Sequence, residues 1–167
     1  IPIKRKGDII CPIARNFEKL LNSIILSVEP HYEIKLYKNN VENLVDCAVA
    51  ELKDENQIDE NILEIGKVNG IRKSEIDLKV KKSGRTTGVT SSKINLTNAT
   101  VEVQMTEKES AIFSNQFVVG PMSEAGDSGS LILDMNNKAV GLLFAGSSKA
   151  TICNEITNVC DSLNIKF

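Results

Sequence analysis

Short stretches in which apolar and polar residues alternate run along the chain and predict a protein built mostly of β-strands. Residues 32–36 and 101–105 alternate strictly, which places their apolar side chains on one face of a half-buried strand. Short apolar runs, which suit buried strands, occur at residues 24–26, 44–45, 112–113, 117–119 and 131–133. Residues 139–144 follow the last of these runs after an Asn-containing turn, which predicts a β-hairpin. Many short strands separated by turns favour an all-β sandwich or barrel.

Helical spacing is weak or short. Residues 15–21 show it weakly, whereas apolar residues recur at i, i+3, i+4 and i+7 between Glu155 and Leu163. The second pattern predicts a short amphipathic helix at the end of the chain. The charged stretch from Glu51 to Asp59 is predicted to be an exposed loop at the start of a connector between two halves.

The composition agrees with a globular domain and excludes two classes of partner. Of the 167 residues, 41% are apolar and 25% are charged, and the net charge is −2. This balance lacks the basic surface of a nucleic-acid-binding protein. No apolar run approaches the roughly 20 residues of a membrane span. We therefore expect neither nucleic acid nor membrane as a partner, and the sequence specifies no oligomeric state.

The four cysteines, at positions 11, 47, 153 and 160, contain no C-x-x-C pair that would indicate a metal site. On one helix face, Cys153 and Cys160 would lie roughly 10 Å apart, too far for a disulfide. We expect all four to be reduced thiols, which favours a reducing, cytoplasmic compartment. His31 is the only histidine, so zinc sites that need several imidazoles are excluded.

The segment Gly126-Asp127-Ser128-Gly129-Ser130 carries the strongest chemical signal. A nucleophilic serine needs an exposed Oγ and nearby backbone N–H groups that can hold a developing oxyanion. Glycines beside the serine permit the tight backbone that turns successive N–H groups toward one point. Taken alone, the pentapeptide fits a purely structural turn equally well.

Three further segments change that balance. Asp46 heads the apolar stretch 45–52, where a semi-buried carboxylate could orient an imidazole. Residues 82–88 form a Gly- and Thr-rich turn between two strand patterns. Residues 140–148 are a strand that ends in small residues, an edge along which a substrate backbone could pair. Each of the three, in isolation, also fits an ordinary strand or turn.

The order of these segments resembles that of the chymotrypsin-like (trypsin-like) serine peptidases, bacterial type. The resemblance covers residues 44–167 and rests on Lys-Ser-Gly-Arg-Thr-Thr-Gly, Ala-Gly-Asp-Ser-Gly-Ser and Val-Gly-Leu-Leu-Phe-Ala-Gly-Ser-Ser. It implies an all-β fold of two antiparallel barrels with the first one incomplete. Residues 1–60 would form a partial first barrel with the connector, and residues 61–167 the second barrel with the nucleophile loop and the C-terminal helix.

The resemblance also implies roles for individual residues in a serine endopeptidase that acts on peptides or proteins through an acyl-enzyme. Ser128 would be the nucleophile and Asp46 the residue that orients the base. The N–H groups of Gly126 and Ser128 would form the oxyanion hole. Substrate binding would fall to four further residues, namely Met122, Phe144, Ala145 and Gly146. This mechanism requires no metal and no cofactor.

The sequence departs from the family pattern at the catalytic histidine. His31 lies only 15 residues before Asp46, much closer than the family places its base, and in a turn-like context. We expect the base to lie upstream of Ile1, which would make this chain a fragment that is inactive alone. Two alternatives stay open: a catalytically inactive chymotrypsin-fold binding or scaffolding module, and an unrelated β domain whose Gly-Asp-Ser-Gly-Ser is a structural turn.

Overall fold

The computed structural model describes residues 16–17, 19–23, 42–51, 58–107 and 109–166. Cys11, His31 and the strands predicted at 24–26 and 32–36 lie outside these residues. Seven elements follow residue 78: β1 (Lys79–Gly84), β2 (Gly88–Gln104), β3 (Ser110–Val119), β4 (Leu131–Asp134), β5 (Ala139–Gly146), β6 (Thr151–Glu155) and α2 (Ile156–Leu163). Residues 16–17 and 19–23 are also helical. None of the described helices has the length and apolar character needed to cross a membrane.

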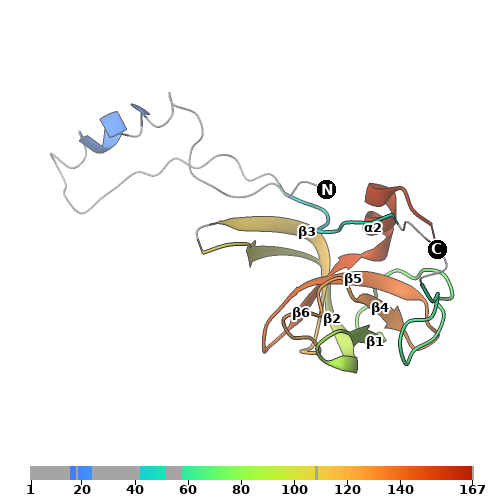
Figure 1. Cartoon of the computed structure of the whole chain (residues 1–167). Helices are drawn as coiled ribbons and strands as arrows, with labels where there is room; N and C mark the ends of the chain where they lie inside the picture. Colours follow the sequence, from blue (N-terminus) through green and yellow to red (C-terminus); the bar gives the residue numbers. More distant parts are fainter. Residues whose placement is uncertain (1–15, 18, 24–41, 52–57, 108, 167) are drawn as a thin grey trace.

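The six strands close into one antiparallel barrel in the order β1-β2-β3-β6-β5-β4 (Figure 1). Closure comes from β1 and β4, where Val80 pairs with Asp134 and Lys81 with Leu133. The predictions of an all-β fold and of a C-terminal helix are thereby confirmed. The barrel lies within residues 61–167, and the domain boundary near residue 60 stays a prediction.

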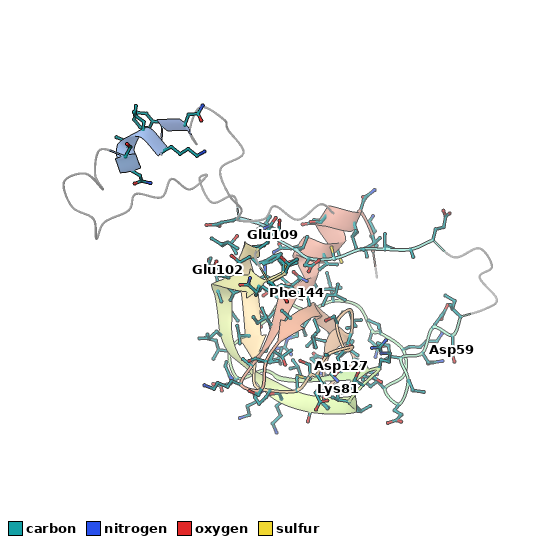
Figure 2. The ribbon with its side chains drawn as sticks, turned by 60° about the vertical axis from the view of Figure 1, so that its left-hand side comes forward. Asp59, Lys81, Glu102, Glu109, Asp127 and Phe144 are labelled. Atoms are coloured by element: carbon teal, nitrogen blue, oxygen red, sulfur yellow. The ribbon has the colours of Figure 1, made fainter. Side chains whose placement is uncertain are left out.

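Strand β2 is long enough to serve two partners because it bends. Its first part pairs with β1 and the rest with β3, with register shifts between Ile94 and Val101. Such bulges bend a strand and increase its twist. Figure 1 shows the far part of the β2–β3 hairpin extending beyond the barrel, and Figure 2 places Glu102 and Glu109 there, away from Asp127. The apolar runs expected at 112–113 and 117–119 belong to one strand, interrupted by Asn115 with φ +57°.

The core has two parts, one inside the barrel and one between the barrel and α2. The inner cluster consists of Val80, Ile94, Phe117, Val119, Met122, Ile132, Val140, Leu143 and Cys153. The outer cluster consists of Val45, Cys47, Leu133, Ala139, Ile156 and Val159. Gly141 is needed between them, because a Cβ there would lie 2.3 Å from the Phe117 ring.

Two expectations differ from the structure. The run at 44–45 is no strand: Leu44 is 53% exposed, and Asn43 alone forms a bridge, to Phe113. Cys153 and Cys160 do not share a helix, because residues 151–155 form β6 and complete the barrel before α2 begins. Cys153 and Cys160 are free thiols.

Candidate active site

Ser128 lies in the loop that joins β3 to β4, and this loop is fastened to β5. Gly129 N–H donates to Leu143 O at 2.7 Å, and Leu143 N–H donates to Ser130 O at 3.0 Å. The backbone of Leu143 makes both bonds, so this one residue of β5 holds the loop against the strand. Ser128 itself is exposed, and its Oγ lies 3.4 Å from Phe144 O, a long contact that leaves the hydroxyl accessible.

The backbone around Asp127 leaves two donors unused. Within the described part of the chain, neither Gly126 N–H nor Ser128 N–H donates a hydrogen bond, whereas Asp127 N–H donates to Glu124 O. Gly126 has φ +104°, and a Cβ there would lie 2.4 Å from Arg85 Nη2. Only glycine fits this conformation in this space. Two N–H groups without a partner in this part of the chain therefore flank Asp127, and one of them belongs to Ser128 itself.

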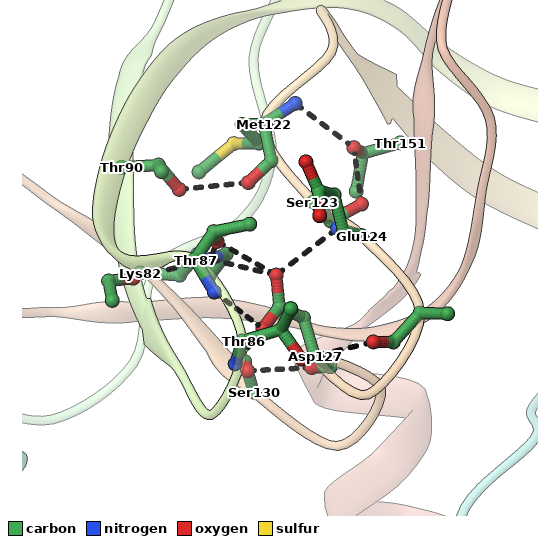
Figure 3. A network of polar contacts seen from close by, with 12 residues as sticks. Lys82, Thr86, Thr87, Thr90, Met122, Ser123, Glu124, Asp127, Ser130 and Thr151 are labelled. Carbon is green, nitrogen blue, oxygen red and sulfur yellow. Dashed lines mark hydrogen bonds and ion pairs between the residues drawn. The ribbon is translucent and has the colours of Figure 1, made fainter.

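A buried ion pair holds this loop from inside the barrel. Lys82 Nζ lies 3.1 Å from Asp127 Oδ2, and both side chains are fully buried. The carboxylate also accepts hydrogen bonds from Thr87 Oγ1 at 2.7 Å, Thr86 N–H at 2.8 Å and Glu124 N–H at 3.1 Å, as Figure 3 shows. Lys82 Nζ in turn donates to Thr87 Oγ1 and, at 3.2 Å, to Gly88 O.

The electrostatics of Asp127 follow from this network. Burial raises the pKa of the carboxyl, but the hydrogen bonds from Thr87, from the backbone of Glu124 and Thr86, and from Lys82 outweigh burial. Together they hold the pKa of Asp127 well below its ordinary value of 3.8. The residue is therefore a charged anchor that ties the loop before Ser128 to the turn between β1 and β2.

The sequence pattern singled out residues 82–88 as a Gly- and Thr-rich turn, but it did not indicate the role of Lys82. The signal was available. Lys82 lies two residues after Val80 on β1, so the alternation of side chains along the strand places both inside the barrel. A lysine on an inward face needs an anionic partner. The identity of that partner, 45 residues later, could not be read from the alternation.

A cavity of about 700 Å³ opens beside Ser128. Met122, 5% exposed, contributes to its lining together with Leu143, Gly146 and Ser147. The hydroxyl groups around Met122 are engaged. Thr90 Oγ1 donates to Met122 O at 2.7 Å, Met122 N–H donates to Thr151 Oγ1 at 3.3 Å, and Thr151 Oγ1 lies 2.8 Å from Ser123 Oγ. Exposed Glu124 is the charged member of the described lining.

Of the residues predicted for substrate binding, the structure brings Met122 and Gly146 to this cavity with Ser128. Phe144 and Ala145 precede Gly146 on β5 and are half-buried, and the Phe144 ring packs against Phe113 with 4.9 Å between the ring centroids.

Asp46 is not among the residues that line this cavity. It is half-buried, and burial raises the pKa of its carboxyl. Its backbone is clamped by the Asn154 side chain, through Asp46 N–H to Oδ1 at 3.0 Å and Nδ2 to Asp46 O at 2.9 Å. Asn154 Nδ2 also donates to Leu142 O, two residues before Phe144 on β5. Asp46 is thus anchored to the strand that contacts Ser128, and its role toward the base stays a prediction.

Comparison with known proteins places the fold. No family model and no curated protein matches the chain. Among solved structures, it is similar to the Nocardiopsis protease, with 25% identity and a TM-score of 0.53 over 60% of this chain and 53% of that one. It is also similar to Cellulomonas bogoriensis chymotrypsin, with 22% identity and a TM-score of 0.54 over 60% of this chain and 55% of that one. A third similar structure is Thermobifida fusca protease A, with 22% identity and a TM-score of 0.55 over 64% of this chain and 57% of that one. The chain spans just over half the length of these structures. It therefore has the fold of the bacterial chymotrypsin-like serine proteases.

Proposed function

We propose that this chain carries the nucleophile half of a serine endopeptidase. The observation that carries the proposal is the exposed Ser128 hydroxyl beside the two unused N–H groups of Gly126 and Ser128. An oxyanion hole consists of such preorganised donors, aimed where negative charge develops. The cavity beside Ser128 gives room for a substrate side chain, and the fold of known serine proteases supports the assignment.

In the proposed reaction, Ser128 Oγ attacks the carbonyl carbon of a peptide bond while a histidine takes the hydroxyl proton. The N–H groups of Gly126 and Ser128 bind the oxygen of the tetrahedral intermediate. The carbon–nitrogen bond then breaks, and the histidine returns the proton to the leaving amine. Water, activated by the same histidine, releases the acyl group from Ser128. In this proposal Asp46 orients the histidine, which a whole protein longer than these 167 residues would supply from a segment before Ile1.

A second candidate function is a binding module that uses the same fold without catalysis. The described part of the chain contains no histidine, and Asp46 is not in the lining of the cavity beside Ser128. A serine hydroxyl without an adjacent base is a weak nucleophile at neutral pH. The two functions make opposite predictions for covalent labelling.

We expect a protein extended upstream of Ile1 by the sequence that its gene encodes to react with a fluorophosphonate probe at Ser128. The 167-residue chain should react at least about 10³-fold more slowly, because a missing triad base removes most of the rate enhancement. Mass spectrometry of the labelled peptide measures both rates. Fast labelling of the 167-residue chain that His31→Ala abolishes would show that His31 is the base. Failure of both proteins to label would favour the binding module.

We also expect the extended protein to cleave after apolar or small side chains at least about tenfold faster than after lysine or arginine. Met122 and Leu143 are buried in the cavity lining, and the hydroxyls around Met122 are engaged, so a basic side chain would find no counter-charge at this depth. Peptide anilides that differ only in the residue before the scissile bond measure this preference. Met122→Asp should shift it toward basic residues. Fastest cleavage after lysine by the unmodified protein would contradict the assignment of the pocket.

A further inference from the structure

A second cavity, of about 1000 Å³, shares no lining residue with the one beside Ser128. It lies between the segment before β1, the bulged middle of the β2–β3 hairpin and the start of α2. Ten of its eleven lining residues have polar side chains, and most of these carry an oxygen acceptor. The lining includes Glu42, Lys73, Ser74, Glu75 and Glu155, together with hydroxyl and amide side chains of the hairpin.

Glu155 is the unusual member of this lining. The residue is only 3% exposed, and its Oε1 accepts a hydrogen bond from Ser74 Oγ, whereas Oε2 is buried without a partner. Glu155 is the N-cap residue of α2 and makes no side-chain capping hydrogen bond there. A buried charge with an unpaired oxygen is destabilising unless a cation pairs with it. The cavity thus has an unpaired carboxylate oxygen just beneath its surface.

The other charges around the cavity indicate the same kind of ligand. Exposed Glu42 and Glu75 add two carboxylates, of which Glu75 already pairs with Arg72 Nη2 at 2.9 Å, against the exposed ammonium of Lys73. Hydroxyl and side-chain amide oxygens from the hairpin supply further acceptors. In the described part of the chain, no three acidic, histidine or cysteine side chains lie close enough to hold a metal ion. An organic cation with several donors suits this lining better than a metal.

A guanidinium group matches these features. It is planar, always charged and more weakly hydrated than an ammonium, so its transfer into a partly buried site is less unfavourable. Its five N–H donors can pair with a carboxylate and reach neighbouring hydroxyl and amide oxygens at the same time. The slender apolar stem of an arginine side chain can carry the guanidinium to an oxygen that lies beneath the cavity surface. We propose that this cavity binds an arginine side chain presented by a partner peptide or protein, with the guanidinium paired to Glu155.

The test uses the ¹⁵N-labelled 167-residue chain and Nα-acetyl-arginine amide as the probe, at low salt. We expect millimolar binding, as is usual for a ligand of this size. Amide signals of residues 73–76, 97–100 and 114–115 should shift. Nα-acetyl-citrulline amide has nearly the same shape without the charge and should bind at least tenfold more weakly. Equal binding of the two probes, or shifts confined to residues around Ser128, would overturn the proposal.

Variants of the chain separate the ion pair from general attraction. Glu155→Gln should weaken binding of the arginine probe at least tenfold, whereas Glu64→Gln, the same change at an exposed glutamate outside the cavity, should leave it unchanged. Lys73→Glu changes an exposed residue and should tighten binding about threefold, which keeps the proposal testable if Glu155→Gln does not fold. Unchanged binding in Glu155→Gln, or in Lys73→Glu, would overturn it. So would shifts of the same amides with Ca²⁺ and none with the arginine probe.

Discussion

Replacement of Lys82 by methionine is expected to lower the free energy of unfolding by about 3–5 kcal/mol. The methionine keeps much of the volume of the lysine but removes the ammonium from a fully buried pair. Asp127 would then keep its hydrogen bonds from Thr87, Thr86 and Glu124 but lose its counter-charge. The anchored loop holds Gly126 and Ser128, so the same change should also disturb the proposed oxyanion hole.

Urea unfolding followed by circular dichroism measures this effect. Lys81→Met is the matched control, since Lys81 precedes Lys82 on β1 and its side chain points to the opposite face of the strand. We expect that control to change the free energy of unfolding by no more than about 0.5 kcal/mol. An equal effect of the two substitutions would show that the ion pair contributes nothing specific.

The same pair predicts how stability depends on pH. The pKa of Asp127 is lower in the folded state than its ordinary value of 3.8, so the folded state favours the charged carboxylate. Its contribution is complete above the ordinary value and is lost as the pH falls below it toward the folded-state pKa. Unfolding free energies measured between pH 7 and pH 2 should therefore fall below about pH 4. The fall should be shallower in Asp127→Asn, and an unchanged slope would contradict the assignment.

Replacement of Ser128 by alanine is expected to abolish fluorophosphonate labelling of the extended protein and to reduce peptide hydrolysis by about 10⁶-fold. The reason is chemical: the proposed acyl-enzyme forms on Ser128 Oγ, and alanine offers no nucleophile. Stability should change little, because Ser128 is exposed and its Oγ makes only the 3.4 Å contact with Phe144 O. Anilide hydrolysis and mass spectrometry of the labelled protein measure the two effects.

Ser130 provides a control two residues away. Its Oγ donates to Asp127 O at 2.5 Å and is half-buried, so Ser130→Ala removes a structural hydrogen bond. We expect a loss of about 1 kcal/mol in stability but continued labelling at Ser128. Persistent labelling of Ser128→Ala, or loss of labelling in Ser130→Ala alone, would show that Ser128 is not the nucleophile.

Much of the fold follows from local pattern. Alternation along residues 101–105, the Asn-containing turn before residues 139–144, and the i, i+3, i+4, i+7 spacing at the end of the chain each predict an element that the structure contains. These signals survive because each depends on neighbours within a few residues. Local pattern also drew attention to Ser128 and Gly126, since glycine beside a reactive residue reflects a local backbone requirement.

Other features depend on how distant segments pack. The alternation of β1 puts Lys82 inside the barrel, but only barrel closure brings Asp127 to it. Residues 44–50 have the apolar character of a strand, yet the Asn154 side chain binds the backbone of Asp46 in place of a strand ladder. Glu155 appears in the sequence as an ordinary acidic residue at a helix start, and the tertiary structure buries it with one oxygen unpaired. The sequence by itself determined which segments become strands, turns and the helix, because those choices depend on local backbone and periodicity. The tertiary structure alone decided which charges are buried and what they face, because burial depends on contacts between residues far apart in the chain.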